Sequence, residues 1–158
     1  MSKAFTSEET AEDAPIVPAR APLPDGVPNY VTPHGLAQLR DEQSALRAQS
    51  GDPAVLAQRR AELEERLATA QVVLPPAEPS DVVRFGATVT VAGANGVRRH
   101  RIVGVDEADP ARGKIAFVSP LARAVVGRAV GDTIRLQAPR GFEDLEIVAV
   151  DYEVPPEA

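Results

Sequence analysis

The sequence predicts an α+β protein, in which an N-terminal antiparallel helical hairpin precedes an antiparallel sheet that carries one short helix. Three observations support this fold class. Residues 30–76 contain two stretches with apolar residues at helical spacing, each opened by a capping residue and a proline. Residues 84–154 contain short runs in which apolar and polar residues alternate, as in strands. Within that second part, Ser119-Pro120 is a start signal for one short helix.

The first helix is predicted to begin at Pro33. Thr32 supplies a hydroxyl cap, and the proline stands where its missing N–H costs nothing. Apolar side chains then recur at helical spacing and form one stripe: Leu36, Leu39 and Leu46. From Pro33 to Gln49, a rise of 1.5 Å per residue gives a length of about 25 Å.

A turn at Ser50-Gly51 separates this helix from a second one. Asp52-Pro53 repeats the pattern of a capping residue followed by a proline, and we expect the second helix to end at residues 72–73. Its apolar stripe consists of Leu56, Leu63, Leu67 and Ala70. A turn this short makes the two helices antiparallel, so they form a hairpin, or short coiled coil.

The second part of the chain alternates with the period of a strand. Five strands are predicted, at residues 85–91, 99–105, 115–118, 133–137 and 145–150. Asn95-Gly96 supplies a hairpin turn. The polar loop from Asp106 to Gly113 is interpreted as a solvated hairpin tip. Ser119 is expected to cap a helix over residues 121–126.

These elements divide the chain into five segments. They are a disordered acidic and proline-rich leader (1–29), the helical hairpin (30–76), a linker (77–83), the sheet domain (84–154) and a tail (155–158). Clustered carboxylates repel one another and prolines forbid a regular helix, which is why the leader is predicted to be disordered.

Composition excludes several classes of protein. The net charge of −6 argues against a protein that mainly binds a nucleic-acid backbone. The absence of cysteine excludes disulfides and thiolate zinc sites. No apolar run approaches the roughly 20 residues of a membrane helix, and the N-terminus has no apolar signal segment, so we expect a cytoplasmic protein. His34 and His100 do not form a metal site, and no cofactor is indicated.

Arg98, Arg99, His100 and Arg101 form a basic run on a predicted strand. Alternate residues of a strand face opposite sides, so only two of the four can share one surface. A solvated strand is the favoured interpretation. A contact with RNA or with an acidic protein surface is the alternative.

A series of segments in order resembles the GreA/GreB family of bacterial transcript cleavage and elongation factors. The segments are YVTPHGLAQLRDE, AQVV, FGATVTV, RIVGVDEAD, VSPLARAVVG, VGD and EIVAVDYE, between Tyr30 and Tyr152. The resemblance implies an N-terminal coiled coil and a C-terminal domain similar to the FKBP fold. It also implies docking at the secondary-channel rim of bacterial RNA polymerase, with nucleic acid reached only through the polymerase. We expect a monomer.

One segment of the resemblance carries the expected polymerase contact. Ser119, Pro120, Leu121 and Arg123 match the family's polymerase-contacting SP-x-AR segment. Ser119-Pro120 is also an ordinary helix start, and Arg123 can instead pair with a carboxylate of its own domain. Capping and docking are compatible with each other.

The hairpin tip departs from the family pattern. In the cleavage factors an acidic cluster there helps to hold a magnesium ion, which favours carboxylate ligands. Here the tip consists of Ser50, Gly51 and Asp52, and its one carboxylate is explained as a helix cap. The arm is also shorter than the family's. We therefore expect a polymerase-binding regulator that is not an enzyme and does not stimulate cleavage.

Other functions remain open at this point. The chain could be a functional transcript-cleavage factor, or a protein like the regulator of nucleoside diphosphate kinase, a short-armed relative that it resembles in arm length. The FKBP-like fold alone also suggests a peptidyl-prolyl isomerase. That activity requires an aromatic-lined pocket, and only 4% of the residues are aromatic.

Overall fold

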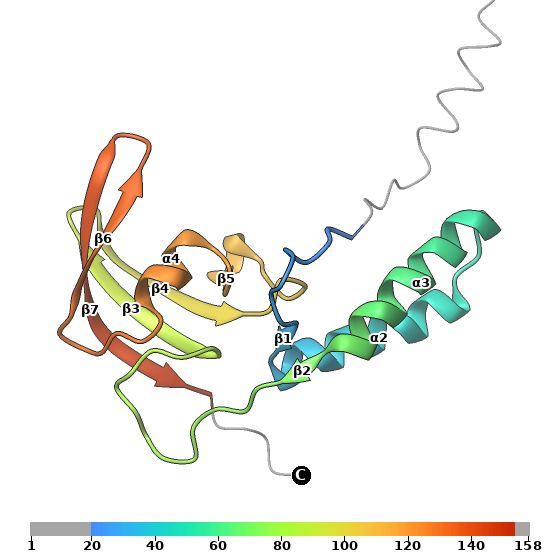
Figure 1. Cartoon of the computed structure of the whole chain (residues 1–158), viewed down its shortest axis with the longest axis horizontal. Helices are drawn as coiled ribbons and strands as arrows, with labels where there is room; N and C mark the ends of the chain where they lie inside the picture. The colour runs from blue at the N-terminus through green and yellow to red at the C-terminus, as the bar shows by residue number, and fades with distance from the viewer. Residues whose placement is uncertain (1–19, 154–158) are drawn as a thin grey trace, which may run out of the picture.

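The computed structural model describes residues 20–153 and contains a pair of helices that projects from a curled sheet (Figure 1). The helices are α2 (Pro33–Ala48) and α3 (Pro53–Thr69), here called the helix pair. The predicted α+β class is confirmed. Most of the predicted leader, residues 1–19, and residues 154–158 lie outside the described residues.

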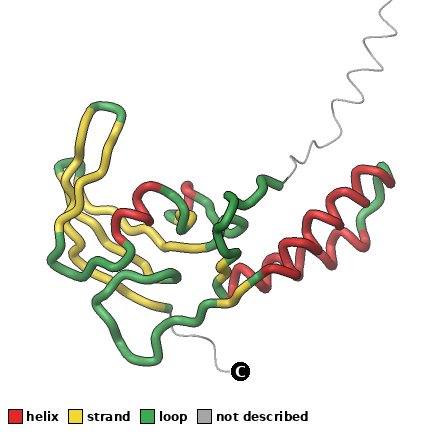
Figure 2. Tube along the Cα trace, in the orientation of Figure 1, coloured by secondary structure: helices red, strands yellow, loops and turns green. Residues whose placement is uncertain are grey.

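Both helices begin where the sequence predicts. The Thr32 hydroxyl accepts a hydrogen bond from the Gly35 N–H at 2.9 Å, and the Asp52 carboxylate accepts one from the Ala54 N–H at 2.9 Å. The two helices lie side by side along their length (Figure 2). Buried Leu39 and Leu63 join them, as the leucine stripes require.

The second helix ends earlier than predicted. It stops at Thr69, and Gln71–Val72 forms a strand, β2, which pairs in parallel with β1 (Tyr30–Val31). The Gln71 N–H donates to the Asn29 carbonyl at 2.8 Å, so the chain finds backbone partners here in a strand. The β1–β2 pair therefore joins the start of α2 to the end of α3.

The sheet has five strands in the order β5-β4-β3-β7-β6. Their bounds are β3 (Ala87–Gly93), β4 (Gly96–Val103), β5 (Lys114–Ala116), β6 (Thr133–Ala138) and β7 (Gly141–Tyr152). The prediction of a wholly antiparallel sheet is wrong, because β5 runs parallel to β4. The segment between β4 and β5 contains the 3₁₀ helix η1 (Pro110–Arg112). It carries the chain back so that β5 can run in the same direction as β4.

The core of this second part, here called the sheet unit (residues 82–152), is aliphatic. One helix, α4 (Pro120–Val125), covers it with buried Ala122 and Val125. The predicted linker 77–83 is wrong at its end. Val83 is fully buried in the core, and Val82 forms a β-bridge with Ala129. The linker sequence shows no alternation of apolar and polar residues, because Val83 is its one residue that is buried in the core.

Residues 20–29, predicted as part of the disordered leader, lie against α3 and the sheet unit. Asn29 is buried, and its side-chain N–H groups donate to the Arg66 carbonyl at 2.9 Å and to the Thr69 hydroxyl at 3.2 Å. The prolines exclude a helix, as expected, but hydrogen bonds hold the segment near both of its ends, with a turn at Asp25-Gly26 between them. The prediction of disorder is wrong for these residues.

Two glycines allow the sheet unit to approach closely to β1 and to the helix pair that follows it. A Cβ at Gly104, which follows β4, would lie 2.4 Å from the backbone carbonyl oxygen of Tyr30. A Cβ at Gly35 in α2 would lie 2.7 Å from a carboxylate oxygen of Glu107. Backbone atoms cannot move aside as a side chain can, so Gly104 is the stricter requirement.

We predict that Gly104→Ala destabilises the protein by about 2 kcal/mol, because overpacking against a fixed backbone forces the two parts to separate. Urea unfolding followed by circular dichroism measures this free energy. Gly51→Ala is the matched control, since its new methyl group would meet only Leu56 at 3.9 Å. Equal stability of the two variants would contradict the close-approach argument.

Candidate functional site

The predicted docking segment lies at the start of α4, with one side in the core and the other in solvent. The Ser119 hydroxyl accepts a hydrogen bond from the Ala122 N–H at 3.4 Å and caps the helix. Leu121 is half-buried against the core, whereas Pro120 and Arg123 are exposed. The segment therefore presents Pro120 and Arg123 to solvent even though Ser119 serves as a cap.

Arg123 does not pair with its own domain. Within residues 20–153, no carboxylate lies within ion-pair distance of its guanidinium group. The side chain is exposed and able to meet an acidic group on another molecule. The alternative of an internal ion pair is thus not realised among these residues.

Exposed apolar residues continue from α4 into the following turn. Val126 is 44% exposed and Val130 is 42% exposed. The helix ends at Val125, one residue before the predicted end, so Val126 leaves the core. Sequence reasoning missed this surface because it placed Val126 within the helix.

The predicted tip residues lie at the far end of the helix pair, away from α4 (Figure 1). Ser50, Gly51 and Asp52 are all exposed. The Asp52 carboxylate caps α3 through the Ala54 N–H. Over the described part of the chain, no group of three or more His, Asp or Glu side chains could hold a metal ion. The two sets of predicted site residues therefore belong to separate surfaces.

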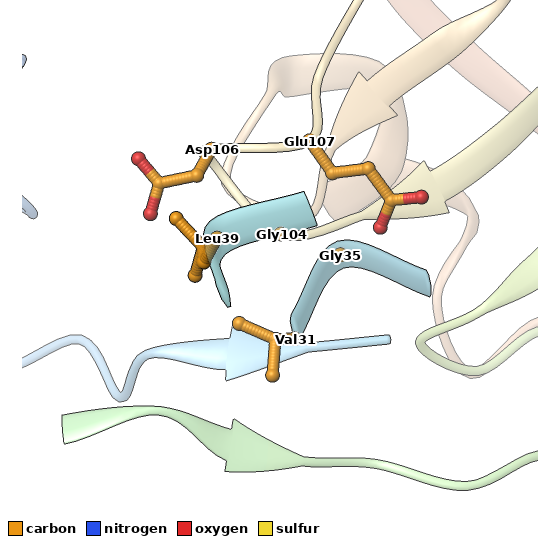
Figure 3. A pocket seen from close by; sticks show the side chains of 6 residues that line it. All are labelled: Val31, Gly35, Leu39, Gly104, Asp106 and Glu107. Carbon is orange, nitrogen blue, oxygen red and sulfur yellow. The ribbon is translucent and has the colours of Figure 1, made fainter. Parts of the chain in front are cut away.

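A third cluster, which sequence reasoning did not find, joins the helix pair to the sheet unit. The predicted solvated tip after β4 is wrong at Asp106 and Glu107, because Glu107 is only 6% exposed and the Asp106 side chain 10% exposed. Both residues lie over the start of α2 and face Gly35 and Leu39 (Figure 3). We call this contact region the junction.

Each junction carboxylate has partners on the helix pair. The Thr32 hydroxyl donates to Glu107 at 2.5 Å while it caps α2, and Asp106 pairs with the buried Arg66 of α3 at 3.2 Å. A second cation, Lys114, lies 3.8 Å from Glu107. Carboxylates this buried require such partners, since burial without them is costly.

Aromatic rings complete the junction. The ring of Tyr30 lies 5.8 Å from that of Phe85 and 5.4 Å from that of Phe117, at tilted angles. These distances are favourable for aromatic pairs. Three aromatic rings of the described residues thus lie together where the two parts meet.

The basic run is divided between the two sides of β4. Arg98 and Arg99 are exposed, and Arg101 pairs with Glu153 at 2.5 Å. His100 lies opposite the buried Val89 and so shares the core-facing side of the sheet. Burial, together with the nearby charge of Arg98, lowers the pKa of His100. The solvated-strand interpretation therefore holds for the first two arginines only.

The lowered pKa of His100 predicts a stability that falls with acidification. The unfolded chain binds the proton first as the pH drops below about 6.5, so the folded state loses stability there and is unaffected above it. We expect His100→Gln to remove this loss. Denaturant unfolding of both proteins between about pH 7.5 and pH 5 tests this. Parallel pH curves for the two proteins would contradict it.

No helix within residues 20–153 has the length and apolar character needed to cross a membrane.

Comparisons with known proteins agree on one family. A family model described as "Transcription elongation factor, GreA/GreB, C-term" matches residues 78–152. The transcription elongation factor GreB of Neisseria meningitidis serogroup A is 34% identical over 153 residues, which covers 78% of this chain and 94% of the relative. The transcription elongation factor GreA of Maricaulis maris is 42% identical over 93 residues, or 58% of this chain. The chain spans only 59% of the length of that GreA relative.

Two solved structures are also similar. A GreA/GreB elongation factor from Nitrosomonas europaea is 26% identical with a TM-score of 0.44, over 78% of this chain and 98% of that one. GreA factor homolog 1 (Gfh1) of Thermus thermophilus is 20% identical with a TM-score of 0.41, over 77% of this chain and 97% of that one.

Proposed function

This chain belongs to the GreA/GreB family of transcription elongation factors, and from that membership we propose that it binds bacterial RNA polymerase and regulates elongation. The observation that carries the proposal is the family match over residues 78–152, which includes all of α4. We propose that the sheet unit corresponds to the family's FKBP-like domain and the helix pair to its coiled coil. We further propose that the protein is a monomer and is located in the cytoplasm.

Docking at the secondary-channel rim is proposed to use α4. Buried Ala122 and Val125 anchor the helix, so its exposed side keeps a fixed position. The exposed guanidinium of Arg123, which has no ion pair within residues 20–153, suits an acidic group on the rim, and Val126 adds apolar surface beside it. An exposed arginine next to an exposed apolar side chain is a typical composition for a protein interface.

The arm favours binding without stimulation of transcript cleavage. Helices of 16 and 17 residues span about 25 Å at 1.5 Å per residue. The alignment with GreB is 153 positions long but includes only 78% of this 158-residue chain. The relative therefore has residues at positions where this chain has none. At the tip the single carboxylate, Asp52, is engaged as a cap. We therefore propose a regulator that is not an enzyme.

The short arm also favours a second candidate. A protein like the regulator of nucleoside diphosphate kinase has an arm of similar length, and such a protein would bind that kinase. Purified kinase added to the binding assay below distinguishes the two candidates, because only the second predicts a complex.

For polymerase binding, we predict that Arg123→Glu weakens the affinity for core RNA polymerase about tenfold, since it places like charges together at the rim. A fluorescence binding titration measures the dissociation constant. Arg140→Glu is the matched control, because Arg140 is exposed on the same unit in the turn between β6 and β7. Equal loss in both variants, or no binding by the wild type at micromolar concentration, would reject docking through α4.

For transcript cleavage, we predict that the protein leaves the RNA of a backtracked polymerase complex intact, because its tip offers no carboxylate cluster for magnesium. Added to the same complex with a genuine cleavage factor, it should reduce cleavage by competition. Gel analysis of RNA 3′ ends measures both effects. Prompt shortening of the RNA by this protein alone would instead identify a functional cleavage factor.

A further inference from the structure

Residues 20–29, here called the strap, contact both helices and the sheet unit at once. The Arg20 guanidinium pairs with Asp106 of the sheet unit at 2.6 Å and with Glu42 of α2. The Arg20 backbone N–H donates to Glu62 of α3 at 3.3 Å. One residue thus connects three elements that are distant in the sequence.

The strap is held at a second point by the end of α3. The side chain of Asn29 donates to the Arg66 carbonyl at 2.9 Å and to the Thr69 hydroxyl at 3.2 Å. Near the start of the strap, the Ala21 carbonyl accepts a hydrogen bond from the Arg66 guanidinium. The strap lies between the sheet unit and the helix pair, where Figure 1 shows it leading into β1. It is therefore anchored at both of its ends.

Arg20 contacts the helix pair farther from its base, the end next to the sheet unit, than the other junction residues do. Thr32 and Tyr30 contact the sheet unit directly before α2 begins. Glu42 is ten positions beyond Thr32, or about 15 Å along the helix. A contact far from a pivot resists tilting more than one at the pivot. Arg20 is consequently placed to control the direction of the arm.

The direction of the helix pair depends on the positive charge of Arg20. Its guanidinium lies between the carboxylates of Glu42 and Asp106, which both bond to it. If the cation is removed, two like charges face each other across the space between the arm and the sheet unit, with Arg66 alone to offset one of them. The carboxylates then favour separation of the arm from the sheet unit.

We infer that the strap is an orientation lock: Arg20 is a positioning residue that fixes the direction of the helix pair relative to the sheet unit. The lock is a property of the free protein. Its consequence, a tip held in one direction for entry into a polymerase channel, rests on the proposed function.

The test is a distance measurement between the arm and the sheet unit in the full chain. The protein has no cysteine, so Ser50→Cys at the tip and Ala94→Cys in the β3–β4 turn can each carry one spin label. Pulsed electron resonance should give a single narrow distance distribution. We expect Arg20→Ala to broaden that distribution by about twofold or to shift it to longer distances.

Two further variants keep the experiment decisive. Glu42→Gln changes an exposed residue and should broaden the distribution in the same sense, even if Arg20→Ala lowers stability. Arg40→Ala is the matched control, an exposed arginine of α2 with no ion pair among the described residues, and it should leave the distribution unchanged. Unchanged distributions in both Arg20→Ala and Glu42→Gln, with native circular dichroism, would refute the lock. Since polymerase is absent, that result is separate from failure of the binding assay.

Discussion

The ion pair between Arg66 and Asp106, with the hydrogen bond from Thr32 to Glu107, holds the helix pair to the sheet unit. All four side chains are largely buried. A buried carboxylate is stable only beside a cation or a donor, so each half of the junction requires the other. The Thr32 hydroxyl serves both parts at once, because it accepts from the first turn of α2 and donates to Glu107. A local helix cap is thereby coupled to a contact 75 residues away in the chain.

This constraint explains features that otherwise look unrelated. Gly104 and Gly35 lack side chains where the two parts meet, because a Cβ at either position would meet atoms of the opposite part. The segment between β4 and the parallel strand β5 supplies Asp106 and Glu107 to the junction. The aromatic residues Tyr30, Phe85 and Phe117 gather at the same place. In our proposal, the junction therefore carries the arm while α4 is left free to bind a partner.

Local signals in the sequence predicted the helix starts well and the hairpin turn of the sheet to within one residue, since the turn is Ala94-Asn95 and Gly96 begins β4. Thr32, Asp52 and Ser119 act on backbone groups two or three residues away, so a short window contains the whole interaction. The junction could not be predicted in this way. Arg66 and Asp106 are 40 positions apart, and nothing near Asp106 in the sequence distinguishes a paired carboxylate from a solvated one. The family resemblance located the candidate docking segment, whereas the exposure of Arg123 came from the structure alone.

The account is tested most directly by a double-mutant cycle at Arg66 and Asp106. The free energy of unfolding is measured for the wild type, for Arg66→Ala, for Asp106→Ala and for the double variant. Each single change removes one charged partner, although Asp106 keeps Arg20 when Arg66 is removed, and should cost about 2 kcal/mol. The double variant should then be at least ~1.5 kcal/mol more stable than the sum of the two costs implies. Strictly additive costs would show that the two side chains are energetically independent, and would contradict a structure held together at this junction.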